Sequence, residues 1–135
     1  MLPESLRSLP YLVHTNRELG LMLAGTKPLA TFSYTDGYEV DFVLRYLRMF
    51  DRHAATGRFT KHKKVSPLQK LNGRLHHQFF YTLPNEDWRV NAMLELLALP
   101  GAWSNERERR YGTLLGYKDW QNDIWLSHHP VPDGR

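Results

Sequence analysis

The strongest periodic pattern of the chain lies between residues 39 and 55. Apolar side chains recur there three and four positions apart, and charged side chains fall on the opposite side of the projected helix. This spacing predicts an amphipathic helix over 39–55 that Gly57 ends. The Asp36–Gly37 pair would also suit a hairpin turn, but that turn would set apolar positions against acidic ones, whereas Asp36 and Glu39 match a capping box. The apolar stripe consists of Val40, Val43, Leu44, Leu47 and Phe50.

Four other segments combine helical spacing with residues typical of helix ends. Thr15 and Glu18 match a capping box, and Gly25 supplies a left-handed stop. Asn85 and Ser104 are the predicted N-caps of two later helices. The predicted helices cover 16–24, 85–98, 104–115 and 119–128, with Val90, Met93, Leu94 and Leu97 as the inner face of the 85–98 helix and with Gly116 before the last one.

Alternation with period two predicts three strands. Residues 28–35 are rich in Thr and aromatic side chains, as strands are. In 58–65 and 74–83 every second side chain shares a face. The segment between them is long for a tight hairpin, so the two strands either form a hairpin with a long loop or pair elsewhere. The elements together predict an α+β fold, a single domain with a small, mainly antiparallel sheet of about three strands packed against four or five helices. The shared faces are Phe59, Lys61, Lys63 and Val65 in one strand and Leu75, His77, Phe79, Tyr81 and Leu83 in the other.

Composition agrees with one ordinary globular domain. The chain has 135 residues, of which 41% are hydrophobic and 13% aromatic, too aromatic for a disordered chain. We predict a single domain over 1–128 and a flexible tail over 129–135, which contains two prolines and a glycine. The lack of cysteine excludes disulfides, thiolate metal sites and cysteine nucleophiles.

Two features of the sequence bear on location. Glu4 and two prolines interrupt the N-terminal stretch where a signal peptide would be continuously apolar. No apolar run approaches the roughly 18 residues of a membrane span. Since cysteine is also lacking, we expect a cytoplasmic protein without a membrane partner.

The stretch GRFTKHKKV, residues 57–65, concentrates cationic and titratable side chains in a chain of formal net charge +4. Strand alternation would divide these side chains between two faces, whereas a nucleic-acid surface gathers its cations on one. Lysines on an edge strand also discourage pairing with another chain, and this is the interpretation that we favour. In the nucleic-acid alternative, the contacts would come from Arg58, Lys61, Lys63, Lys64 and Arg74, with Phe80 as a stacking platform.

The seven histidines do not have the spacing of a metal site. No two of them stand four apart on a predicted helix, and the adjacent pair His76 and His77 would point to opposite faces of a strand. The sequence also has no nucleophile elbow and no glycine-rich phosphate loop, so neither a metal nor a cofactor is predicted. If the chain is an enzyme, we expect His76 or His62 as the general base and an arginine that holds an anionic substrate.

Aromatic and arginine side chains offer candidates for partner binding. Trp103 follows an apolar helix end in a predicted loop, and Arg107 and Arg110 lie in the mixed-charge stretch after it. Trp and Arg are enriched among the residues that dominate protein interfaces. Our leading hypothesis is therefore a small, non-catalytic binding protein of the adaptor, inhibitor or immunity type. A small enzyme and a nucleic-acid-binding protein remain the alternatives, and the sequence does not indicate an oligomeric state.

Overall fold

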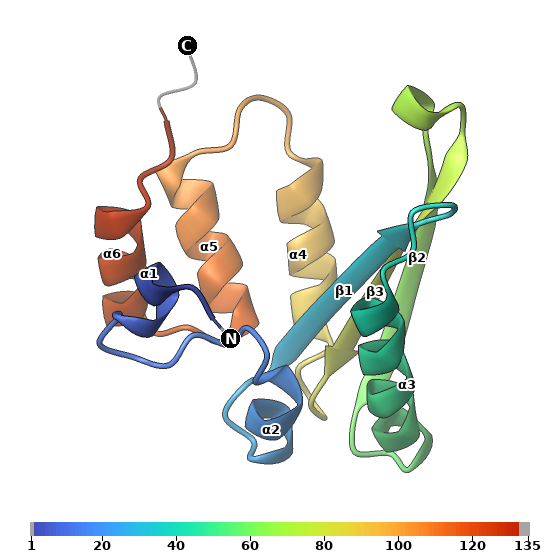
Figure 1. Ribbon diagram of the computed structural model, residues 1–135, viewed down its shortest axis with the longest axis horizontal. Coiled ribbons are helices and arrows are strands. Elements are labelled where there is room, and N and C mark those ends of the chain that lie inside the picture. Colours follow the sequence, from blue (N-terminus) through green and yellow to red (C-terminus); the bar gives the residue numbers. More distant parts are fainter. Residues whose placement is uncertain (1, 133–135) are drawn as a thin grey trace. The chain divides into compact units, whose positions relative to one another are not determined.

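The computed structural model describes residues 2–132, and within this range it contains one three-stranded antiparallel sheet and six α-helices, four of them at least ten residues long (Figure 1). The predicted class, a small α+β domain, is confirmed. Contacts between Cα atoms group the chain into two compact units. Unit 1 comprises the described residues of 1–28 and 91–135, and unit 2 comprises 29–90. The predicted boundary at residue 128 stays a prediction, and residues 133–135 of the predicted tail lie outside the described range.

Unit 2 contains the sheet, in the order β1-β3-β2, with strands β1 (Leu29–Thr35), β2 (Thr60–Leu68) and β3 (Arg74–Thr82). β2 is therefore an edge strand, which allows Pro67 within it, since a proline cannot donate to a second neighbour. The predicted loop over 66–73 is wrong in part, because Ser66 to Leu68 continue the pairing with β3. A short 3₁₀ turn, η1 (Gln69–Leu71), and positive φ angles of 56° at Asn72 and 78° at Gly73 close a tighter hairpin than its length indicated.

Helix α3 (Asp41–Ala55) packs on one face of this sheet, which we call the α3 face. Phe50 is fully buried there, with ring centroids 5.0 Å from both Phe32 of β1 and Tyr81 of β3. The predicted apolar stripe thus has its core partners in the sheet. The predicted capping box is wrong: Val40 is the N-cap, and the Asp36 carboxylate instead lies 2.8 Å from the His77 imidazole.

Unit 1 is helical. Its elements are α1 (Glu4–Arg7), α2 (Glu18–Leu23), α4 (Trp88–Ala98, whose first three residues group with unit 2), α5 (Asn105–Leu115) and α6 (Asp119–His128). Ser104 caps α5 as predicted, since its hydroxyl accepts a hydrogen bond from the Arg107 backbone N–H. Gly116 ends α5 with φ 104°, and a Cβ there would lie 2.5 Å from the Pro28 ring, so only glycine fits both the angle and the contact.

Three predictions about helix ends and faces are wrong. Thr15 does not cap α2, because Asn16 adopts a left-handed φ of 66° and the helix begins at Glu18. Asn85 does not cap α4 either: its φ is 70°, in a turn after β3, and the helix begins three residues later. In α4 the buried residue near the end is Leu96, while Leu97 is 44% exposed. The short helix α1 was not predicted.

Candidate functional site

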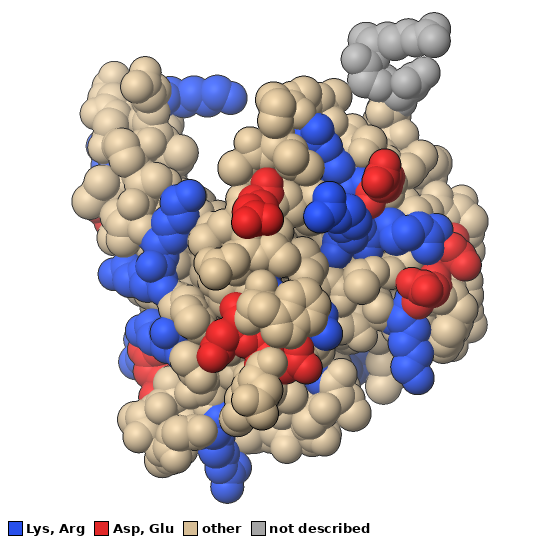
Figure 2. All heavy atoms as spheres, turned by 180° about the vertical axis from the view of Figure 1, so that it is seen from behind, with Lys and Arg blue, Asp and Glu red and all other residues tan. Residues whose placement is uncertain are grey.

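The basic strip of unit 2 follows the predicted alternation. Lys61 pairs in register with Tyr81 and Lys63 with Phe79, which places both lysines on the α3 face, whereas His62 and Lys64 point to the opposite face. The Lys61 ammonium lies 2.8 Å from the Asp51 carboxylate of α3, so part of the positive charge is already paired. Figure 2 shows Lys and Arg side chains spread along the β2–β3 hairpin, on the left in that view, with uncharged surface between them.

The remaining residues of the nucleic-acid alternative are not drawn into one surface by the strands. Arg74 is exposed, and its guanidinium lies over the Tyr38 ring and donates to the Asp36 carbonyl. Arg58 is exposed before β2 begins. Phe80 is only 1% exposed, so the prediction that it offers a stacking platform on an outer face is wrong.

The two candidate general bases have separate surroundings. The His62 imidazole lies 3.2 Å from the Asp87 carboxylate, which also accepts a hydrogen bond from the Thr82 hydroxyl; these bonds, from Thr82 first and then His62, lower the pKa of Asp87. The His76 imidazole lies 2.9 Å from the Thr35 hydroxyl on the neighbouring strand. Neither histidine lines either of the two cavities described in the structure.

The three candidate partner-binding residues differ in their exposure and in their hydrogen bonds within the protein. Trp103 is half-buried, and its indole N–H donates to the Glu108 carboxylate. The Arg107 guanidinium donates to three backbone carbonyls after α4, at Leu99, Pro100 and Gly101, and so stabilises the turn that follows that helix. Arg110 is exposed.

One end of the α3 face carries exposed apolar side chains that the sequence analysis did not single out. β2 and β3 extend past the first turn of α3 (Figure 1), and beyond the rows that Phe50 covers lie Val65, 43% exposed, and Leu75, 41% exposed. The connection between β1 and α3 borders this end, because the Asp36 N–H donates to the Leu75 carbonyl. We name this surface the open sheet end and define it by Tyr38, Phe42, Val65 and Leu75, which are between 41% and 59% exposed.

In unit 1 a lysine is buried against a histidine. Lys27 is 2% exposed, and its Nζ lies 2.8 Å from His14 Nδ1 and donates to the Leu115 carbonyl at the end of α5. Burial lowers the pKa of Lys27 to about 7, an effect that Glu18 partly offsets. Burial and the neighbouring Lys27 lower the pKa of His14 to about 3. Because neither side chain lines a described cavity, we interpret the pair as a link between the segment after α2 and α5.

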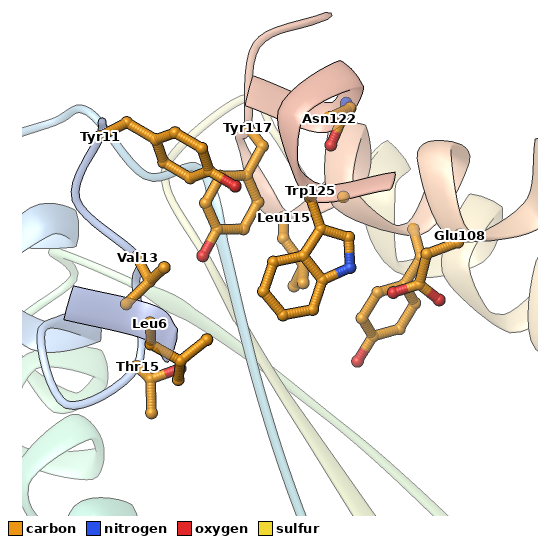
Figure 3. A pocket seen from close by; sticks show the side chains of 11 residues that line it. Leu6, Tyr11, Val13, Thr15, Glu108, Leu115, Tyr117, Asn122 and Trp125 are labelled. Atoms are coloured by element: carbon orange, nitrogen blue, oxygen red, sulfur yellow. The ribbon is translucent and has the colours of Figure 1, made fainter. Parts of the chain in front are cut away.

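Unit 1 also contains a cavity of about 230 Å³ whose lining includes four aromatic side chains. Its lining comes from three parts of the chain: the segment 6–15, the helix α5 with the turn after it, and α6 (Figure 3). Sequence reasoning missed this site because its residues are far apart in the chain. The sequence does contain three tryptophans after residue 100, but only Trp103 was singled out, as a partner contact, and it is Trp125 that lines the cavity. The aromatic and polar members of the lining include Tyr11, Tyr111, Tyr117, Trp125, Glu108 and Asn122.

Two searches of the described residues bear on the remaining classes of site. No group of three or more His, Asp or Glu side chains in residues 2–132 is placed to hold a metal ion. None of the helices in that range has the length and apolar character needed to cross a bilayer. Comparison with protein-family models, with curated proteins and with solved structures found no match.

Proposed function

We propose that the chain is a non-catalytic binding protein of the adaptor, inhibitor or immunity type, whose unit 2 binds an acidic partner protein at the open sheet end. The observation that carries the proposal is the group of four large apolar side chains exposed at the open sheet end, with Phe42 in the first turn of α3 and the other three outside that helix. Exposed apolar clusters with a polar rim are typical of protein interfaces. The absence of cysteine suits a reducing compartment, and we propose the cytoplasm as the place of action.

Charge favours an acidic partner. Unit 2 contains ten Lys and Arg against six Asp and Glu, so it carries the net charge of +4. Beside the open sheet end, Lys63 has no acidic partner among residues 2–132, and its ammonium lies 5.2 Å from the centroid of the Phe79 ring. Like charge opposes a second copy of the chain in this place, while an acidic surface would associate faster and in the correct orientation.

The same features argue against the two alternatives. A nucleic acid would meet exposed apolar side chains where it needs cations, and the strands separate the predicted cationic contacts between two faces. A histidine base requires a substrate site beside it, and the described cavities are lined by other residues than His62 and His76.

The test compares two double variants of the immobilised chain in capture from the source cell. Phe42→Ser with Val65→Thr removes apolar surface at the open sheet end, and Leu12→Ser with Leu97→Ser removes comparable exposed surface in unit 1. Each captured protein is then purified and titrated by calorimetry. We expect an acidic protein whose affinity falls at least about tenfold with the first variant and is unchanged with the second. Its affinity should also fall with added salt and with Lys63→Glu.

Three results would contradict the proposal. Captured proteins could bind both double variants equally, which would place the interface elsewhere. The chain could form dimers in size-exclusion chromatography that Phe42→Ser with Val65→Thr dissociates, which would make a second copy the occupant. Purified DNA or RNA could bind the chain with an affinity that falls steeply as salt is added and that Lys64→Ala and Arg74→Ala reduce. This result would favour the nucleic-acid alternative.

A further inference from the structure

The cavity of unit 1 is walled by four aromatic rings and one carboxylate. Tyr11, Tyr111, Tyr117 and Trp125 supply the rings and Glu108 the carboxylate, and the lining includes no Lys, Arg or His. Figure 3 shows Tyr11, Tyr117, Trp125 and Glu108 arranged around the same space. The negative π-faces of aromatic rings attract cations, and cages of such rings recognise quaternary ammonium groups.

Each of the four rings is supported by a second ring that does not line the cavity. Tyr117 stacks on His14 at a centroid distance of 3.8 Å, and Trp125 stacks on His129 at 4.1 Å. Tyr11 and Tyr111 make edge-to-face contacts, at 5.7 Å with Trp120 and at 6.1 Å with Trp103. The lining rings are therefore held in position without a ligand, and such preorganisation lowers the entropic cost of binding.

The charge of the lining is negative. The Glu108 carboxylate accepts a hydrogen bond from the Trp103 indole N–H, which fixes its orientation. Burial raises the pKa of Tyr11, Tyr111 and Tyr117, so these hydroxyls stay neutral at physiological pH. One anionic group among neutral aromatic rings suits a ligand with one positive charge.

The type of cation follows from what the walls offer. A primary ammonium is strongly hydrated and needs several acceptors in place of its water, whereas the walls are mostly aromatic and aliphatic side chains. Methyl groups on the nitrogen replace its N–H donors with apolar surface that packs on aromatic rings, and the positive charge is kept. The volume of about 230 Å³ lies below the usual range for drug-sized ligands, so the bound group is small.

We infer that unit 1 binds a methylated ammonium group in this aromatic cage, which goes beyond the proposed function of unit 2. The group could belong to a free small molecule, such as choline, or to a trimethylated lysine side chain of a protein. Both present the same chemistry to the cage, and the experiment separates them.

The experiment is calorimetric titration of the full chain with tetramethylammonium, with choline and with 3,3-dimethylbutan-1-ol, the uncharged carbon analogue of choline. A trimethyllysine peptide and its unmodified form make a second pair. We expect the cations to bind and the neutral analogue to bind about three- to thirtyfold more weakly. If the trimethyllysine peptide binds more tightly than both its unmodified form and choline, the source is a protein side chain. If choline binds more tightly than the trimethyllysine peptide, the source is a free ligand.

The variants locate the binding. Glu108→Gln keeps the size of the side chain and an acceptor for Trp103 but removes the charge, and we expect it to weaken cation binding without changing the weak binding of the neutral analogue. Trp125→Leu removes a ring face, while Trp88→Leu, at a tryptophan of unit 2 that is 55% exposed, is the matched control. Circular dichroism checks that each variant is folded.

The inference is overturned if the neutral analogue binds as tightly as choline, because the cavity would then be merely apolar. It is also overturned if no cation binds at millimolar concentration, or if Glu108→Gln retains full affinity. The unit 2 variants Phe42→Ser with Val65→Thr leave this cavity intact, so failure here and failure of the proposed protein interface are separate results.

Discussion

The two compact units differ in how they handle charge and aromatic side chains. Unit 2 has ten Lys and Arg against six Asp and Glu, while unit 1 has eight of each and no net charge. Both units expose some large apolar side chains, but those of unit 2 accompany a net positive charge, whereas unit 1 arranges four rings around a cavity. A basic surface attracts an acidic macromolecule over a distance, and an electrically neutral unit can enclose a cation without long-range repulsion. The two proposals therefore assign a different mode of binding to each unit.

The largest expected effect concerns the core of unit 2. Phe50→Ala removes a fully buried ring that contacts Phe32, Phe59 and Tyr81, and we expect the free energy of unfolding to fall by about 3–5 kcal/mol. Urea unfolding followed by circular dichroism measures the change. A loss below about 1 kcal/mol would mean that α3 does not anchor the sheet through this ring.

The next effect concerns the buried Lys27 and appears only on changing the pH. Its pKa is about 7 in the folded chain and close to 10.4 in the unfolded chain, so between these values only the unfolded chain holds the proton. The free energy of unfolding should therefore rise with pH from about 7 to about 10, by roughly 2–4 kcal/mol. Lys27→Met should remove this rise. Urea unfolding at pH 6.5, 8 and 9.5 provides the measurement. If the free energy of unfolding changes equally with pH in both proteins, the pKa of Lys27 is not lowered in the folded chain.

His14 predicts a second pH dependence with the same sign at lower pH. Its pKa of about 3 in the folded chain lies below the ordinary value of about 6.5, so the unfolded chain binds the proton first. The contribution of neutral His14 to the free energy of unfolding should be complete above about pH 6.5 and should decline as the pH falls toward 3. Lys27→Met tests the coupling as well: without the neighbouring amine, the His14 pKa measured by NMR should rise. An unchanged pKa would assign the whole shift to burial.

A smaller effect is expected at the polar end of the unit 2 core. The Tyr81 hydroxyl donates to the Asp51 carboxylate at 2.7 Å, and Tyr81→Phe should cost about 1 kcal/mol because only that hydrogen bond is lost. Lys61→Ala, which removes the partly exposed ion pair with the same carboxylate, should cost less than about 1 kcal/mol and lose its effect at high salt. A thermal or urea titration of both variants ranks them. The reverse order would mean that the surface pair outweighs the buried hydroxyl.

The sequence predicted the elements better than their ends. The strand over 74–83 and the helix within 39–55 were predicted correctly, because each pattern spans several residues or turns. The burial of their faces was predicted only in part, since Phe80 and Thr82 are buried on the second face of β3 and Val40 is 44% exposed. The capping boxes at Thr15 and Asp36 were wrong, although Ser104 was right. A capping residue is one side chain with several possible partners, and at Asp36 the imidazole of His77 from the neighbouring strand was the partner that the fold supplied.

At the candidate sites, the sequence predicted the side-chain orientations that a single strand fixes, but not the contacts between distant segments. The opposite orientation of His76 and His77 follows from the strand and is confirmed by the pairing with Thr35 and Tyr34. The engagement of Arg107 with three carbonyls after α4 depends on a turn that only the coordinates show. The aromatic cage was beyond prediction for the same reason, since Tyr11 and Tyr117 are over a hundred positions apart in the chain.

The sequence by itself determined the α+β class, the alternating faces of the strands, the amphipathic α3 and the basic character of residues 29–90. These properties arise from the fixed periods of helix and strand and from composition, and neither depends on how distant segments pack together. The tertiary structure alone decided that β2 is an edge strand, that Lys27 is buried against His14 and that four aromatic rings meet around one cavity. Each of these depends on which distant segments pack together, and that choice is made by the burial of the whole apolar surface at once.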